Sequence, residues 1–497
     1  MANAESFPHP VYAQFVLEPQ FQESKHHLFD HMIAANEAHT IMLHECGILD
    51  GDQSASLLLA LQQVRTEGVH SFRYEPHVED LFFAVEGRLI EIAGAEIGGN
   101  LQIARSRNDL AAGMSRLMMR ERLIAAGQQL LNLRDTLIDV AAQHTDSIMA
   151  GITHTQPAQP TTFAHYLLGV IAPLERDFAR LQNAIHHTNQ SSFGVAAFTT
   201  TSFPINRDRV AELLGLPKVI ENGYDAVGTG DHIMESAAAL TNSVGSLSRF
   251  VYDLLVFSRA TENLLKIDDA FIQISSIMPQ KRNPVVLEHI RVRIGWVYGE
   301  ATSVQTMIHS AAFGDTNDVE DPMFIALNRA FDAFDAVVSL LDAVLQSAQF
   351  NTSLMRERAY GGHMTTTALA DALVQNYGIA FRSAHGIVSR LVNQSQRAGK
   401  PIDAEMVNGA SAEVLGSPLD VTTAFVESAL DPWEFVKARA LYGGCAPEAT
   451  SAAIADARVR LQHDQSLLLK LRHAIENAHN DRTTRLSEII SAHDHPG

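Results

Sequence analysis

The chain has 497 residues, of which 46% are hydrophobic, 19% charged and only 7% aromatic. Its 37 lysines and arginines face 57 acidic residues, so the formal net charge is −20. Such an acidic surface argues against nucleic-acid or anionic-membrane partners, because both are recognised through basic patches. A small anionic substrate stays possible, since a pocket can be positive within a negative surface.

The two cysteines, Cys46 and Cys445, lie near opposite ends of the chain. They are too few for a thiolate metal cluster or a disulfide framework, which fits a reducing compartment. The opening residues lack a signal-peptide pattern, and no apolar run reaches the roughly 18 residues that a membrane span needs. The pairs His26-His27 and His186-His187 have no carboxylate at ligand spacing. We therefore expect a cytoplasmic protein with no membrane contact and no metal.

The length corresponds to about three domains, and apolar residues recur at helical spacing over unusually long stretches. Five long helices are predicted, at Asp109 to about Asp146, Thr161 to about His187, Asp231 to about Leu265, Pro284 to about Ala311, and Pro322 to about Gln349. Strand patterns are scarce, so the prediction is an all-α bundle with at most a small sheet. Apolar residues on several faces, as at Ala237–Leu240 and at Phe331 with Phe334, suggest subunit association.

The segment Ser275–Pro284 carries two hydroxyls and the cation of Lys281 directly before a predicted helix. A helix N-terminus offers unpaired N–H groups and a positive dipole end, which suit a carboxylate. A serine-rich loop that merely caps the helix is the structural alternative.

Two further polar clusters flank the first long helix. Arg105–Asp109 precedes it, and its arginines could grip a carboxylate, or Asn108 or Asp109 could simply cap the helix. Gly151–Pro160 follows the helix and packs hydroxyl, imidazole and amide groups into one predicted loop. A lone loop histidine such as His154 is often only a solvated side chain.

Taken together, the three clusters resemble the argininosuccinate lyase branch of the fumarase/aspartase superfamily. The family signature GSSxMPxKxNPxxxE is matched from Ile274 to Glu288, the SRND segment at Ser106–Asp109 and the THxQxAQP segment at Thr153–Pro160. Further matches in family order are Glu79-Asp80, Phe203–Arg207, Asp225–Val227 and Phe381–His385. The resemblance covers nearly the whole chain after about residue 30.

This resemblance implies an all-α, three-domain fold with a central long-helix bundle and a homotetrameric 20-helix core. The expected domains are residues 1–108, 109–358 and 359–497. It also implies reversible, cofactor-free elimination of an amine from an N-substituted aspartate, which releases fumarate at sites built by loops from three subunits.

Residue roles also follow from the resemblance. Ser276 would be the base, ionised with the help of Lys281, and His154, oriented by Glu288, would assist the leaving nitrogen. The remaining site residues would bind substrate; they are Ser106, Arg107, Asn108, Thr153, Gln156, Ser275, Met278 and Asn283.

The main departure from the branch lies at Phe313–Pro322, where argininosuccinate lyases read approximately YNKDLQEDKEP. Here the tyrosine, lysines and glutamine are gone, and Asp315, Asp318, Glu320 and Asp321 remain. Smaller departures are Val11–Phe15 in place of WGGRF, Ile274 in place of glycine, and Ala104 before Arg105, where the branch has TG. We therefore favour another N-substituted aspartate, such as ethylenediamine-N,N′-disuccinate. Argininosuccinate is the alternative substrate, and a non-catalytic crystallin-like relative is a remote one.

Overall fold

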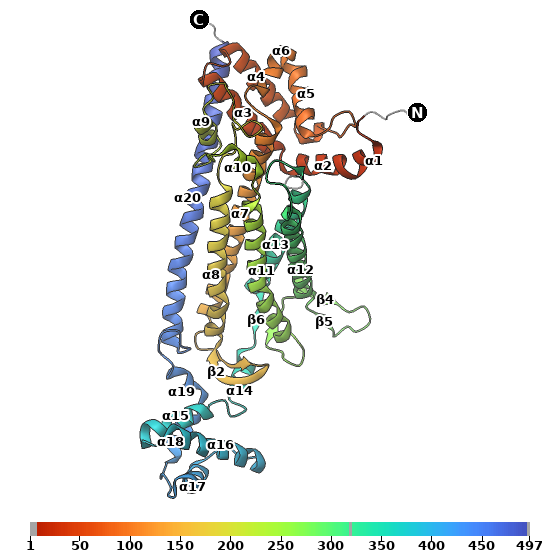
Figure 1. Cartoon of the computed structure of the whole chain (residues 1–497). Helices are drawn as coiled ribbons and strands as arrows, with labels where there is room; N and C mark the ends of the chain where they lie inside the picture. Colours follow the sequence, from red (N-terminus) through yellow and green to blue (C-terminus); the bar gives the residue numbers. More distant parts are fainter. Residues whose placement is uncertain (1–6, 318–320, 495–497) are drawn as a thin grey trace.

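The computed structural model describes residues 7–317 and 321–494. Its centre is a bundle of long helices (Figure 1). They are α7 (Arg107–Ala142), α8 (Phe163–Thr188), α11 (Asp231–Phe257), α12 (Val285–Ile308) and α13 (Asp321–Ser347). All five predicted helices are thus confirmed. The third ends at Phe257, earlier than expected, and the chain then turns through Asn263, where φ is +50°, into strand β3.

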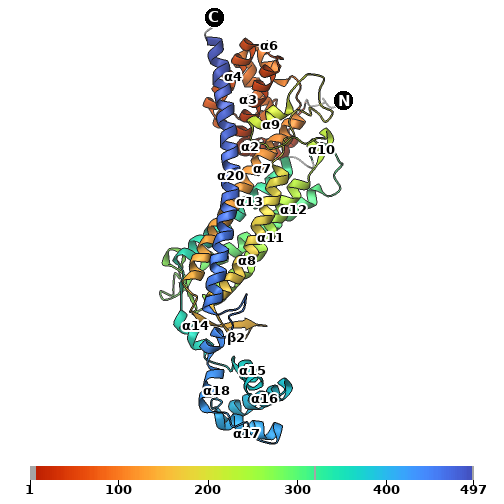
Figure 2. The ribbon, with the colours of Figure 1, turned by 90° about the vertical axis from the view of Figure 1, so that its left-hand side faces the viewer.

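A sixth long helix, α20 (Pro447–Asp494), was missed by the sequence analysis, which assigned this stretch to a C-terminal domain. It packs on α7, α8 and α4 and runs along the whole bundle (Figure 2). The sequence does contain a pattern that indicates this helix. Apolar residues that face the core are spaced by multiples of seven, at Ile454, Leu461, Leu468, Ile475 and Ile489. Such a heptad spacing predicts one long stripe packed against a neighbouring helix.

Smaller helices cover both ends of the bundle. At one end lie α1 (Pro10–Tyr12), a π-helix (Ala13–Leu17), α2 (Glu18–His27), α3 (Phe29–Glu45), α4 (Gly51–Glu67), α5 (Leu81–Ala93) and α6 (Ala95–Gly98), with α9 (Arg207–Leu213) and α10 (Gly223–Gly228). At the other end lie α14 (Thr352–Ala359), α15 (Thr366–Tyr377), α16 (Phe381–Ala398), α17 (Ala404–Leu415), α18 (Thr423–Leu430) and α19 (Pro432–Lys437). The N-terminal helices therefore lie far from α15–α18 (Figure 1).

Sheet structure in the described residues is limited to three antiparallel pairs. They are β1 (Ile148–Thr153) with β2 (Gln156–Thr162), β3 (Leu265–Lys266) with β6 (Gln349–Phe350), and β4 (Gln273–Ile274) with β5 (Arg282–Asn283). This agrees with the small sheet expected from the sequence.

One continuous apolar core joins the N-terminal helices, the bundle and α20, whereas α15–α18 enclose a separate core around Leu373 and Leu391. The domain boundaries at residues 108 and 358 stay a prediction.

Ala237, Leu240, Phe331 and Phe334 are buried within a single chain. They are therefore not the surface that would join subunits, contrary to the reasoning from the sequence.

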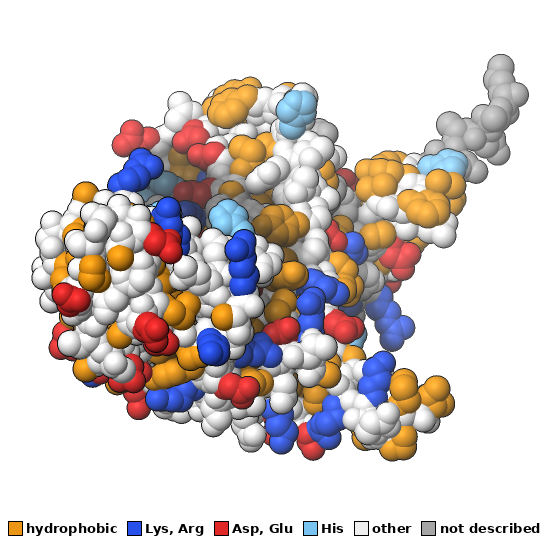
Figure 3. All heavy atoms as spheres, turned by 90° about the horizontal axis from the view of Figure 1, so that it is seen from below, with side chains coloured by type: hydrophobic (Ala, Val, Ile, Leu, Met, Phe, Trp, Pro, Cys, Tyr) orange, Lys and Arg blue, Asp and Glu red, His pale blue; other side chains and the backbone are white. Residues whose placement is uncertain are grey.

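Charge is mixed rather than segregated on the face seen from below, where basic and acidic side chains alternate among hydrophobic ones (Figure 3). Among residues 7–317 and 321–494, no helix has the length and apolar character needed to cross a bilayer.

An ion pair between the buried Arg134 of α7 and Asp464 of α20 links the two helices. The Arg134 side chain is 0% exposed and donates a hydrogen bond to Asp464 at 2.6 Å. Substituting Arg134 with Met should lower the free energy of unfolding by about 3 kcal/mol, because the Asp464 carboxylate loses its partner in a largely dehydrated place. Arg458→Met removes an exposed pair with Asp135 and Asp139 and should cost under about 1 kcal/mol. Thermal denaturation at one protein concentration compares the stability of the two variants. Equal losses of stability would contradict the larger contribution assigned to the Arg134–Asp464 ion pair.

Candidate active site

The first turn of α7 is built around Ser106. Its side chain accepts the Asn108 backbone N–H, and its own N–H donates to Asp109 Oδ1 at 2.9 Å, forming a capping box. The N-cap is therefore Ser106, not Asn108 or Asp109 as the capping alternative supposed. Asp109 Oδ2 also accepts the backbone N–H groups of Gly194 and Ala196. Burial raises the pKa of Asp109, although these hydrogen bonds oppose the shift.

Arg107 is engaged by carboxylates of its own chain. Its guanidinium lies 3.0 Å from Asp80 Oδ2 and 3.4 Å from Glu79 Oε1, and it stacks over the Phe83 ring. Asp80 is also the N-cap of α5. Burial raises the pKa of Asp80, and the pairing with Arg107 only partly offsets this. Arg107 is thus held at one wall of a cavity, where an anionic ligand would have to compete with Asp80 and Glu79 for it.

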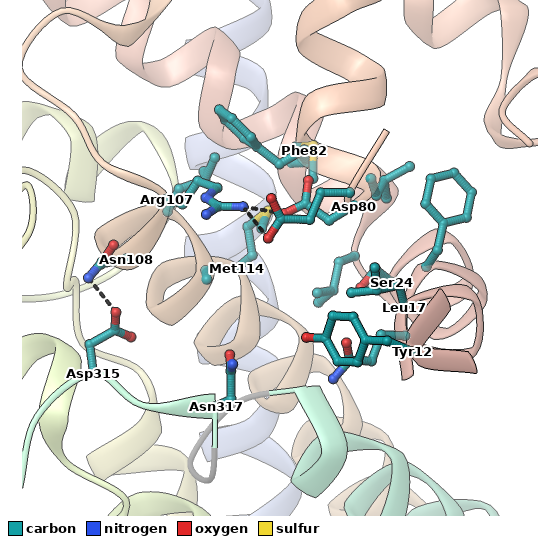
Figure 4. A pocket seen from close by; sticks show the side chains of 18 residues that line it. Tyr12, Leu17, Ser24, Asp80, Phe82, Arg107, Asn108, Met114, Asp315 and Asn317 are labelled. Atoms are coloured by element: carbon teal, nitrogen blue, oxygen red, sulfur yellow. Dashed lines mark hydrogen bonds and ion pairs between the residues drawn. The ribbon is translucent and has the colours of Figure 1, made fainter. Parts of the chain in front are cut away.

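The cavity has a volume of about 260 Å³ and lies between α2, the start of α5 and the first turns of α7. Asn108 donates a short hydrogen bond to the Asp315 carboxylate at its rim (Figure 4). Tyr12, Gln20, Ser24 and Asn317 also line it, and none of these was predicted as a site residue. For Tyr12, the signal was that it falls in the segment replacing the family's WGGRF. The acidic Asp315 lies here as well; Asp318 and Glu320 lie outside the described residues, as does the side chain of Asp321.

The residues Thr153, His154 and Gln156 lie on a hairpin, β1–β2, which we call the histidine hairpin. His154 and Thr155 form its two-residue turn with positive φ values of 54° and 63°, as tight hairpins require. A side chain at Gly151 would place its Cβ 2.8 Å from the Gln159 carbonyl oxygen, which explains the glycine. The sequence pattern predicts a loop here, because two prolines in β2 obscure the alternation typical of a strand. The three polar side chains are exposed in the single chain.

The segment Ser275–Asn283, called the serine loop below, projects from the start of α12 between β4 and β5. The Ser275 hydroxyl accepts the Met278 backbone N–H at 3.1 Å, and the Asn283 side chain donates to the Gln273 carbonyl at 3.1 Å. Ser276, Met278 and Lys281 are exposed, and so is Glu288 in the first turn of α12. Pro284 is the N-cap of α12, one residue before the position predicted for it.

Within one chain, the cluster around Arg107 is far from the histidine hairpin and from the serine loop. Helix α7 has 36 residues, so Arg107 and the histidine hairpin are separated by about 54 Å along its axis. Helix α12 has 24 residues and places the serine loop about 36 Å from the segment that carries Asp315. Both the hairpin and the serine loop lie in the half of the bundle away from α2 (Figure 1). The structure therefore brings together Ser106, Arg107 and Asn108, but neither His154 nor Ser276 joins them.

Comparisons with known proteins agree with the resemblance seen in the sequence. A lyase family model matches residues 19–299, and a model of the argininosuccinate lyase C-terminal region matches residues 363–437. Argininosuccinate lyase 1 of Shouchella clausii is 34% identical over 93% of this chain and 94% of its own length. The argininosuccinate lyase of Natronomonas pharaonis is 37% identical over 94% and 92%.

Among solved structures, an EDDS lyase in complex with formate superposes with a TM-score of 0.86 at 29% identity, covering 95% of this chain and 96% of that one. A fumarate lyase from Mesorhizobium sp. BNC1 shares the fold at 18% identity, with a TM-score of 0.71 over 88% and 98%. The chain therefore belongs to the argininosuccinate lyase branch of the fumarase/aspartase superfamily and is a carbon–nitrogen lyase.

Proposed function

We propose that this fumarate-releasing lyase eliminates the amine from an aminocarboxylic acid such as ethylenediamine-N,N′-disuccinate. The observation that carries the reaction type is the membership in the argininosuccinate lyase branch together with the intact serine loop. Ser276, Lys281 and Asn283 occupy the signature positions on one short projection before α12, where Ser276 and Lys281 are exposed and Asn283 is partly buried. A structural role accounts for the Asn283 amide, which donates to the Gln273 carbonyl, but not for the exposed side chains of Ser276 and Lys281.

The chemistry explains why a cation and an amide accompany Ser276. Removal of the proton next to a carboxylate creates an aci-carboxylate dianion, which preorganised donors and positive charge stabilise. We assign this role to Lys281 and Asn283, helped by the N-terminus of α12. Ser276 removes the proton once Lys281 and the exclusion of water favour its ionised form. His154, oriented by Glu288, assists the departing nitrogen, while Ser106, Arg107, Asn108 and Thr153 hold the succinyl carboxylates.

These roles require more than one chain at each site, since the cluster around Arg107 cannot meet the histidine hairpin or the serine loop within one chain, and we propose a homotetramer. The proposed core contains the five helices α7, α8, α11, α12 and α13 of each subunit, 20 in all. Supporting this assembly, α11 and α12 expose large apolar side chains along the bundle: Tyr252, Val292, Trp296 and Tyr298 are each more than 40% exposed. Such a surface is uncommon in a monomer and typical of an interface.

The nature of the leaving amine is inferred from the acidic cavity beside Arg107. Asp315 remains in a segment that lacks the tyrosine, lysines and glutamine of argininosuccinate lyases, and Glu79 and Asp80 add two carboxylates to the cavity. Three acids against one guanidinium favour a cationic leaving group. The likeness to an EDDS lyase structure supports an aminocarboxylate substrate.

Argininosuccinate is the second candidate, because relatives at 33–37% identity along nearly the whole chain are argininosuccinate lyases. A guanidinium would also be attracted to the acids of the cavity.

Incubation of the purified enzyme with fumarate and either ethylenediamine or arginine distinguishes the two candidates. We expect the ethylenediamine adducts, separated and identified by mass, to form at least about tenfold faster than argininosuccinate. Formation of argininosuccinate alone would overturn the preferred substrate, and absence of both adducts would overturn the proposed function.

A further inference from the structure

The N-terminal arm, defined as Pro10–His27, contains a π-helical turn at Ala13–Leu17. The Glu18 backbone N–H donates to the Ala13 carbonyl, which is the i→i+5 bond of a π-helix. Such turns are rare and often occur at functional sites. In a regular α-helix, residues five apart lie about 140° from each other around the axis, so Tyr12 and Leu17 would face different directions.

The π-turn instead brings Tyr12 onto the same side as Leu17. From Leu17 onward the cavity-lining residues of the arm follow α-helical spacing, at Gln20, Phe21 and Ser24, whereas the step from Tyr12 to Leu17 is five. Figure 4 shows the Tyr12 hydroxyl pointing away from the arm, into the space between Asn317 and α7. The wider turn therefore adds a second hydroxyl, besides that of Ser24, to this wall of the cavity.

The position of Tyr12 is opposite the charged wall of the same cavity. Arg107 and Asp80 lie across from it, and Asp315 lies at the rim, held by Asn108. The Phe7 ring packs 6.2 Å from the Tyr12 ring and supports its orientation. A volume of 260 Å³ equals that of about nine water molecules. It is therefore large enough for a small amine beyond the carboxylate held at Arg107.

We infer that the N-terminal arm selects the leaving amine, with the Tyr12 hydroxyl and the Asp315 carboxylate as the two acceptors for a cationic nitrogen. This inference rests on the proposed function and adds the residues that decide its specificity. In this chain, a hydroxyl on the N-terminal arm replaces the tyrosine missing from the segment around Asp315. The acceptors belong to one subunit and are set at opposite sides of the cavity, so they favour an amine with more than one donor.

The test is the rate of adduct formation from fumarate and ethylenediamine, or arginine if that is the amine which the wild type adds. Tyr12→Phe should raise the KM for the amine about tenfold, the usual effect of losing a hydrogen bond to a charged group. The KM for fumarate should stay within twofold. Asp315→Asn should act in the same direction. An equal rise of both KM values, or an unchanged amine KM, would overturn the inference.

Two further variants separate the geometry of the arm from its chemistry. Deletion of Gln14 shortens the π-turn by one residue while Tyr12 stays, and it should raise the amine KM as much as Tyr12→Phe does. Phe15→Leu, on the same arm but 70% exposed and outside the cavity, should change neither KM. An unchanged amine KM in the Gln14 deletion would contradict the role of the π-turn. A wild type that adds no amine would instead refute the proposed function.

Discussion

Replacing Ser276 with alanine is expected to lower the rate of fumarate release by about a thousandfold, the usual contribution of a positioned general base. The hydroxyl is exposed on the serine loop, so its loss leaves no cavity in the core and should not change the melting temperature. Fumarate absorbance in the ultraviolet follows the reaction directly. Near-normal turnover would refute the assignment of Ser276 as the base.

The matched control is Gln280→Ala, an exposed residue on the same loop. It removes a polar side chain at a position that the family signature leaves variable, so turnover should stay within about threefold of the wild type. A loss as large as that of Ser276→Ala would mean that any change in the loop prevents catalysis, and the serine would then have no special role.

Co-expression of two inactive variants should restore activity if the site is shared between subunits. One chain would carry His154→Asn and the other Ser276→Ala, with different affinity tags so that mixed tetramers can be isolated. Random assembly gives each site an intact histidine with probability one half and an intact serine with the same probability. About one quarter of the wild-type activity is therefore expected when the two residues come from different chains.

The same experiment contains its own control. Variants that are both in the serine loop, Ser276→Ala with Lys281→Met, should regain much less activity, because both residues would reach a given site from the same chain. Mixed tetramers of the first pair that remain inactive would show that one chain supplies both His154 and Ser276 to a site, and would contradict the proposal that these two residues come from different subunits.

Much of the fold was predictable from local patterns. The five bundle helices have long runs of helical spacing between glycine- and proline-rich connections, and each was found within a few residues, apart from the early end of α11 at Phe257. Helix α20 was missed because most of its side chains are polar and exposed. Only a stripe with a period of seven, including Ile454 and Leu461, faces the core. The histidine hairpin was read as a loop because Pro157 and Pro160 lie within its second strand.

The candidate site was only partly predictable. Ser276, Lys281 and His154 were found because family motifs surround them in the sequence. Tyr12 was not: the departure from WGGRF marked its segment, but no spacing rule anticipates the π-turn that brings its side chain to the cavity. Asp315 was noted only as part of an acidic segment, and its hydrogen bond to Asn108 joins residues 207 positions apart.

The sequence by itself determined the family, the helical bundle and the three clusters that carry the chemistry, since each depends on residues close together along the chain. Only the tertiary structure decided how far apart these clusters lie, because that distance equals the length of rigid helices such as α7. It also decided which carboxylates face Arg107 and which wall of the cavity carries Tyr12. The negative net charge seen at the outset is therefore compatible with an anionic substrate: cationic groups stand at separate points of the bundle, and subunit assembly would bring them together.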